Sequence, residues 1–169
     1  MTSRGLSPLN PELLSYHENL TSGNHRVTSP DSDEYNCIAW AAEDTSNWWW
    51  PSQNPEDAFW PEGIDRMATL DAFQAAFMLR GFEPCLEDAF EPGDEKIAAY
   101  VLNDVPTHAA RQLPNGRWTS KLGDQQDIEH DSVDAVSDRT YGRVELILRR
   151  PRAGEAERQR RRRTRQARP

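Results

Sequence analysis

The hydrophobic period of the chain changes between its two halves, and this change restricts the fold more than any other feature. In the first half, apolar residues recur at helical spacing over 70–80, after the capping residues Thr69 or Asp71 and before Gly81. In the second half, 96–102 is apolar on both faces, as in a buried strand. Pro114-Asn115-Gly116 then separates two further strands, 107–113 and 117–122. Helices followed by antiparallel strands predict an α+β fold.

Two shorter helices and a last strand complete the predicted elements. Asn10 and Pro11 begin a helix over 12–20, Asn36 caps a helix over 37–43, and a strand over 142–149 ends before Pro151. A chain of 169 residues is too short for two ordinary domains. We therefore expect N-terminal helices packed on an antiparallel sheet. Residues 1–34 form an N-terminal helix and loop, 35–150 form one domain with them, and 151–169 form an arginine-rich disordered tail.

Charge is divided unevenly along the chain. Residues 1–148 contain 26 acidic and 10 basic residues, a net charge of -16, whereas 149–169 contain 10 arginines and 2 glutamates, a net charge of +8. The basic run 158–165 is expected to be a solvated end, although it can also bind phosphates or lie along the acidic body. An acidic body repels polyanions, and no aromatic residue interleaves with the arginines to stack on bases. These features disfavour nucleic acid as the main partner.

The chain has no stretch near the length of about 18 apolar residues that spans a bilayer, and residues 1–5 lack the apolar core of a signal peptide. We expect no membrane association and a cytoplasmic location. In that reducing compartment Cys37 and Cys85 are expected to be free thiols. No Cys/His spacing is typical of a zinc site, so we expect neither a metal nor a cofactor.

Cys37 and His108 are the candidate reactive residues. A thiol at the first position of a capped helix is favoured as thiolate by the helix dipole, and the free amides there can stabilise an oxyanion. His108, on the first hairpin strand, can act as base and acid if the hairpin packs across the start of the helix. The two residue types in this arrangement predict a thiol nucleophile with a histidine partner.

Four segments resemble the signature blocks of a family of small uncharacterised bacterial proteins. They are 35–41 (YNCIAWA), 48–51 (WWWP), 107–112 (THAARQ) and 118–123 (WTSKLG). The order of Cys37 on a helix and His108 on a later hairpin is also similar to papain-like cysteine hydrolases, including the NlpC/P60 group. The resemblance implies a papain-like fold with a catalytic pair, and it favours Ser120 as the orienting residue. The glutamine that papain carries before its cysteine has no counterpart in 31–34.

The residue that orients His108 depends on the turn of the hairpin. A two-residue turn at Asn115-Gly116 places His108 on one face with Thr119 and Lys121, whereas a three-residue turn through Arg117 places it with Ser120 and Asp124. The residues alone leave both possibilities open.

The other histidines are given no catalytic role. His17 lies in a predicted helix and His25 in a loop, and neither has a partner pattern. Residues 127–130, which end in His130, are interpreted as a solvated turn with an exposed histidine rather than as a second base.

Tryptophans are concentrated just after the cysteine. Trp40, Trp48, Trp49, Trp50 and Trp60 fall within 21 residues. The irregular loop 45–63 is expected to cover the core with its rings. A second interpretation makes the first four of these rings the wall of a groove that binds an extended peptide or a sugar-linked peptide.

Together these features predict a thiol-dependent hydrolase or acyltransferase that acts on an amide, peptide or thioester bond of a peptide or protein substrate. The alternative is a non-catalytic interaction module on the same scaffold, which binds through the tryptophan loop and retains an inactive pair.

Overall fold

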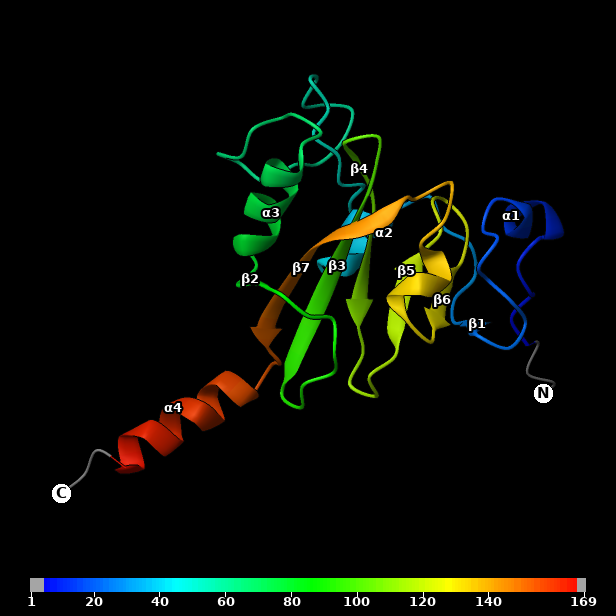
Figure 1. Ribbon diagram of the computed structural model, residues 1–169. Coiled ribbons are helices and arrows are strands. Elements are labelled where there is room, and N and C mark those ends of the chain that lie inside the picture. Colours follow the sequence, from blue (N-terminus) through cyan, green and yellow to red (C-terminus); the bar gives the residue numbers. More distant parts are fainter. Residues whose placement is uncertain (1–4, 167–169) are drawn as a thin grey trace.

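A computed structural model describes residues 5–166, except for the side chain of Ala156, and its centre is one seven-stranded sheet (Figure 1). The strands occur in the order β1-β6-β5-β4-β3-β7-β2, and all neighbouring pairs are antiparallel. Their bounds are β1 (His25–Val27), β2 (Glu83–Cys85), β3 (Asp94–Leu102), β4 (Val105–Gln112), β5 (Trp118–Lys121), β6 (Asp127–His130) and β7 (Arg143–Pro151). The helices are α1 (Pro11–Ser15), α2 (Cys37–Ala41), α3 (Leu70–Met78), the 3-10 helix η1 (Val133–Val136) and α4 (Glu155–Gln166). The predicted α+β class is confirmed.

Each face of the sheet has its own hydrophobic core. Helices α2 and α3 and the tryptophan loop cover one side, which we call the helix face, and pack on Ile97, Ala109 and Leu148. Helix η1 and residues from the N-terminal segment cover the other side, which we call the second face; Figure 1 shows η1 and α2 on opposite sides of the sheet. Because side chains alternate along a strand, Ala110 points to the second face while Ala109 points to the helix face.

The hairpin between β4 and β5 closes through a three-residue turn. The amide of Leu113 donates to Arg117 O at 2.7 Å, so residues 114–116 form the loop, and Gly116 supplies its left-handed position with φ of +83°. This geometry sets the pairing Arg111↔Thr119. Ser120 consequently lies on the same face as His108, which resolves the open choice between Thr119 and Ser120.

Several predicted elements differ from those observed. The first helix stops at Ser15 rather than reaching Leu20, because His17 turns into the second-face core and meets Asp138. The expected solvated turn at 127–130 is wrong: Asp127–His130 is the fully buried strand β6, which lies between β5 and β1.

The C-terminal segment also differs from its prediction. Residues Glu155–Gln166 form helix α4, where the sequence suggested a disordered tail. Arginine, glutamine, glutamate and alanine are all good helix formers, so the segment can be helical without an apolar face.

Candidate functional site

The start of α2 is built around the side chain of Asn36. Its Oδ1 accepts hydrogen bonds from the amides of Ala39, at 3.1 Å, and Trp49, at 3.2 Å, while its Nδ2 donates to Trp49 O at 2.7 Å. The residue is only 4% exposed. Asn36 therefore caps the helix and ties the tryptophan loop to it, which places Cys37 at the first helical position as predicted.

The thiol of Cys37 lies against the backbone of β4. Its Sγ is 4.0 Å from Thr107 O, and the amides of Ala109, Ile38 and Cys37 itself also point at the sulfur. The β4–β5 pairing ends at Arg111↔Thr119, so β5 does not pair with β4 beside His108, and Cys37 contacts the β4 backbone there. Burial raises the pKa of the Cys37 thiol to about 11, although these amide hydrogen bonds oppose the effect. Cys37 is 7% exposed and is a neutral thiol at pH 7.

His108 is the first member of a chain of hydrogen bonds on the second face. Its Nε2 lies 2.9 Å from Ser120 Oγ, Ser120 Oγ lies 2.8 Å from His130 Nε2, and His130 Nδ1 lies 2.8 Å from Ser132 O. All three side chains are fully buried. Burial lowers the pKa of His130 to about 4 and that of His108 well below its ordinary value. Both rings are therefore neutral at pH 7.

The donor and acceptor of each hydrogen bond in this series follow from the last group, the carbonyl of Ser132. Because the carbonyl of Ser132 can only accept, His130 Nδ1 carries the proton and the neutral ring leaves Nε2 as an acceptor. Ser120 must then donate to His130, so it accepts from His108 Nε2–H. A neutral His108 that is protonated at Nε2 has a bare lone pair on Nδ1. This atom has no hydrogen-bond partner and is buried.

Cys37 and His108 approach each other but are not hydrogen-bonded within the described residues. Cys37 belongs to the helix-face core and contacts the backbone on both sides of His108, at Thr107 O and the Ala109 amide. The imidazole packs on the second face, stacked on Tyr141 with ring centres 3.9 Å apart. The strand backbone thus lies between the thiol and the ring.

Two other histidines lie near this arrangement although the sequence indicated no role for them. His130 enters through the pairing of β6 with β5, which was difficult to infer because residues 127–130 contain a single apolar residue, Ile128. His17 Nδ1 is 2.7 Å from Asp138 Oδ2, and its ring is 4.8 Å from that of Tyr141. His17 is thus in the layer that packs on His108, 91 positions along the chain from it. The one signal in the sequence was the Ile128-Glu129-His130 alternation of a strand.

Lys121 is a buried cation on the helix face. Its Nζ donates to Ser32 O at 2.7 Å, to Gly123 O at 3.0 Å and to Gln125 O, and it lies 5.1 Å from the Tyr35 ring centre. These bonds join the segment before Cys37 to the β5–β6 turn. The charge also favours the thiolate form of Cys37. Asp124, the alternative orienting residue, lies exposed in that turn with its carboxylate bonded to Gln125, away from His108.

The four tryptophans predicted to line a groove have different environments. Trp49 is 0% exposed, and its Nε1 donates to Asp44 Oδ2 at 2.8 Å, so it is part of the core and does not face an open groove. Trp40 is half-buried and donates to Thr119 Oγ1 at 3.0 Å, and Trp48 and Trp50 are also half-buried. Of the four, the three half-buried rings present surface to solvent. Trp48 and Trp50 flank the buried Trp49 and stay at the surface, because three consecutive tryptophans cannot all enter one core.

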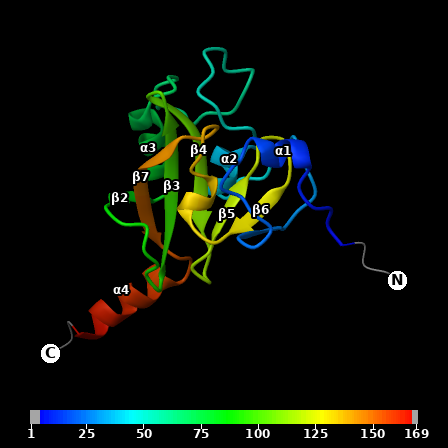
Figure 2. The same ribbon diagram turned by 45° about the vertical axis from the view of Figure 1, so that its right-hand side comes forward.

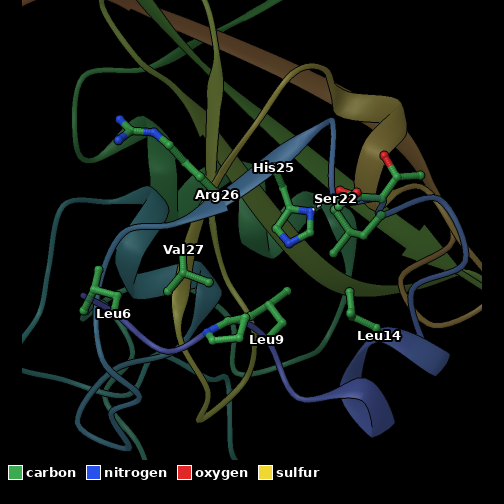
Figure 3. A pocket seen from close by; sticks show the side chains of 10 residues that line it. Leu6, Leu9, Leu14, Ser22, His25, Arg26 and Val27 are labelled. Carbon is green, nitrogen blue, oxygen red and sulfur yellow. Dashed lines mark hydrogen bonds between the residues drawn. The ribbon is translucent and has the colours of Figure 1, made fainter. Parts of the chain in front are cut away.

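A separate pocket of about 510 Å³ lies beside the N-terminal segment (Figure 3). Its walls are mostly apolar, from Leu9, Leu14 and Val27, and the His25 ring points into it, whereas Arg26 points away toward its partner Glu129. A pocket of this size is often a ligand site. It is not lined by Cys37 or His108, so we place the candidate chemistry at the cysteine rather than at this pocket.

Over residues 5–166, no three His, Cys, Asp or Glu side chains are grouped so that they can hold a metal ion. In the same range, no helix combines the length and apolar character needed to cross a membrane.

The fold and the site define an α+β protein with a helix-borne cysteine packed on a seven-stranded antiparallel sheet. The sequence pattern of the family described as Domain of unknown function (DUF7689) matches residues 26–149, and the chain belongs to that family. The match includes α2, α3 and β2 to β6, whereas α4 lies outside it. No curated protein and no solved structure matches the chain.

Proposed function

We propose that the protein is a thiol-dependent hydrolase or acyltransferase on a papain-like scaffold, with Cys37 as nucleophile and His108 as general base and acid. The observation that carries the proposal is the bare Nδ1 of His108. The ring is held by Ser120 and His130 through its other nitrogen, and Nδ1 has no partner in a buried site. Buried polar atoms without partners are rare and costly, and this lone pair is available to accept a proton.

The proposed reaction begins from a neutral pair. Cys37 Sγ forms a bond to the carbonyl carbon of an amide, peptide or thioester while its proton passes to His108 Nδ1. That proton then passes to the leaving amine or thiolate, and the acyl group remains on the sulfur. Water loses a proton to Nδ1 as it attacks the acyl carbon, the bond between the acyl carbon and Sγ breaks to release the acid, and the proton passes from Nδ1 to Sγ to restore the thiol. A second nucleophile in place of water gives acyl transfer.

The proposed reaction requires the thiol and the ring to meet at the edge of β4. Because the strand backbone lies between them and the ring is held by Ser120 and Tyr141, the edge of β4 must shift relative to the start of α2 in addition to rotation of the two side chains. The free amides at the start of α2 can then bind the developing oxyanion, as the segment before Cys37 has no glutamine for this role. A peptide or protein substrate would reach this edge beside the half-buried ring of Trp40, which is bonded to Thr119 of β5.

An activated ester provides a test that does not depend on the natural substrate. On incubation with p-nitrophenyl acetate, mass spectrometry should locate an acetyl group on Cys37. The rate of p-nitrophenol release should fall by about 100-fold or more in His108→Ala, in the range of a lost general base. Ser120→Ala should lower it less, because the ring remains but the proton on Nε2 is no longer directed. Cys85→Ser is the matched control and should react like the parent protein.

If the rate is the same in the parent protein and in His108→Ala, with circular dichroism showing both folded, the proposal is refuted. Acetylation on Cys85 or on lysines with Cys37 unmodified would refute it equally.

The burial of Cys37 favours a second candidate, a non-catalytic interaction module. A thiol that is 7% exposed and neutral at pH 7 is typical of a structural cysteine. In this case Cys37→Ala should fully complement a strain that lacks the gene, whereas Trp48→Ala with Trp50→Ala should not, since these rings reach the surface. Trp49 is unsuitable for this comparison because its removal perturbs the core.

A further inference from the structure

Helix α4 carries a positive charge that the body of the protein does not neutralise. It contains six arginines, at positions 158, 160, 161, 162, 163 and 165. Two of them have ion pairs, Arg158 with Glu155 at 3.9 Å and Arg161 with Glu157 at 2.7 Å, and both glutamates belong to the helix itself. Within residues 5–166 the other four arginines of α4 have no acidic partner. The helix is therefore a free cationic element.

The helix also lies away from the acidic body. Figures 1 and 2 show α4 leaving the end of β7 and extending from one corner of the sheet in both views. Its first residue, Glu155, packs against the turn at Gly93. A helix of this length reaches about 18 Å, which is beyond the Debye length of about 8 Å at physiological salt. Repulsion between the acidic body and a polyanion bound at the far end of α4 is thus largely screened.

The composition of α4 excludes the usual apolar docking modes. It contains no apolar residue larger than alanine, and at 100° per residue its arginines point to all sides of the axis. A helix that inserts into a membrane interface, or that packs in a protein groove, needs an apolar face. A surface of arginines on every side matches a partner that surrounds the helix with negative charge.

We propose that α4 binds in the major groove of duplex DNA, with its arginines on the phosphates of both strands. The groove is about 12 Å wide and admits a helix of about 10–12 Å diameter. The major groove of A-form RNA is too narrow for this, and α4 has no aromatic residue to stack on the bases of a single strand. The contacts are to backbone phosphates, so the binding is independent of sequence.

Binding should also stabilise the helix. Arg158 and Arg162, and likewise Arg161 and Arg165, are like charges four positions apart, an arrangement that destabilises an isolated helix. Phosphates placed between these side chains remove the repulsion. Duplex DNA should therefore increase the helical content of the full-length protein.

The test is fluorescence anisotropy of a labelled 20-base-pair DNA duplex with the full-length protein across a salt series. With six phosphate contacts, log K should fall with log salt at a slope of about -5, so the affinity should fall about 1000-fold between 50 and 200 mM. Replacing Arg160, Arg162, Arg163 and Arg165 together by Gln should reduce the slope to about -2. The same four positions changed to Lys should retain the slope, because the phosphate contacts depend on charge. Arg139→Gln with Arg143→Gln, exposed on the body, is the matched control and should change nothing.

Three results would overturn the proposal. One is a slope unaffected by the four Gln substitutions, and another is tighter binding to duplex RNA or to a single strand than to duplex DNA. The third is a dimer in sedimentation velocity that the Gln substitutions dissociate, in the absence of DNA binding, since this would assign α4 to the acidic body of a second copy.

Discussion

Replacing Asn36 by alanine should destabilise the protein far more than the loss of a surface cap. Asn36 forms three hydrogen bonds at once, accepting from the amides of Ala39 and Trp49 and donating to Trp49 O. All of these groups lie in the buried junction between α2 and the tryptophan loop. Alanine retains none of the bonds and is too small to close the junction.

The magnitude follows from the number of groups left unpaired. The lost helix cap contributes about 1 kcal/mol. The amide and carbonyl of Trp49 then remain buried without partners, and each costs at least about 1 kcal/mol. The expected loss in the free energy of unfolding is therefore about 3 kcal/mol. For a urea m-value of about 2 kcal/mol/M, the midpoint of unfolding should fall by about 1.5 M.

Urea unfolding followed by tryptophan fluorescence measures this change, and the chain provides a matched control. Asn10 has the same capping role at α1, accepting from the Glu12 amide at 2.8 Å, but it is exposed. Asn10→Ala should cost no more than about 1 kcal/mol. If the two variants lose the same stability, or if Asn36→Ala loses less than about 1 kcal/mol, the reasoning from buried unpaired groups is refuted.

Three further predictions concern other parts of the molecule. Gly142→Ala should lower the free energy of unfolding by more than about 3 kcal/mol, because φ is +78° at this position and the added Cβ would lie 1.9 Å from Val101 O. Gly81→Ala is the control: φ is +87° there but the space is open, so the loss should be about 1 kcal/mol. Equal urea midpoints for the two variants would contradict this prediction. Burial lowers the pKa of His130 to about 4 from its ordinary 6.5, so between these pH values the ring is protonated in the unfolded chain and neutral in the folded protein. The free energy of unfolding should therefore fall by about 3 kcal/mol as the pH drops from 6.5 to 4. In parallel urea titrations, the difference in free energy of unfolding between the parent protein and His130→Gln should shrink over this range, and a constant difference would contradict the prediction. In Cys85→Ser, where Cys37 is the remaining thiol, the iodoacetamide rate should rise about tenfold per pH unit from 7 to 10, because the pKa is about 11; a plateau near pH 8 would contradict that value.

The sequence predicted best the features that depend on neighbouring residues. The Asn36 cap acts on a residue three positions away, and Gly81 follows α3 with φ of +87°. The position of Cys37 at the start of its helix was therefore predictable. The buried strand β3 was equally clear, since a run of apolar residues on both faces suits a strand covered on each side.

The hydrogen bonds that join His108, Ser120 and His130 could not be predicted from neighbouring residues. Ser120 faces His108 because the turn has three residues, and a shift of one residue would have presented Thr119 instead. His130 joins them because β6 pairs with β5 at Trp118↔His130. Neither relation has a signature within a few residues of the groups concerned.

The sequence by itself determined the class of the fold and the start of the cysteine helix. Each follows from the hydrophobic period or from hydrogen bonds between close neighbours. Only the tertiary structure decided which nitrogen of His108 is bare, that Trp49 is core and not surface, and that the thiol and the ring lie on different sides of β4. These depend on strand pairing and burial, in which residues far apart in the chain meet, and a one-residue shift exchanges the two faces of a strand.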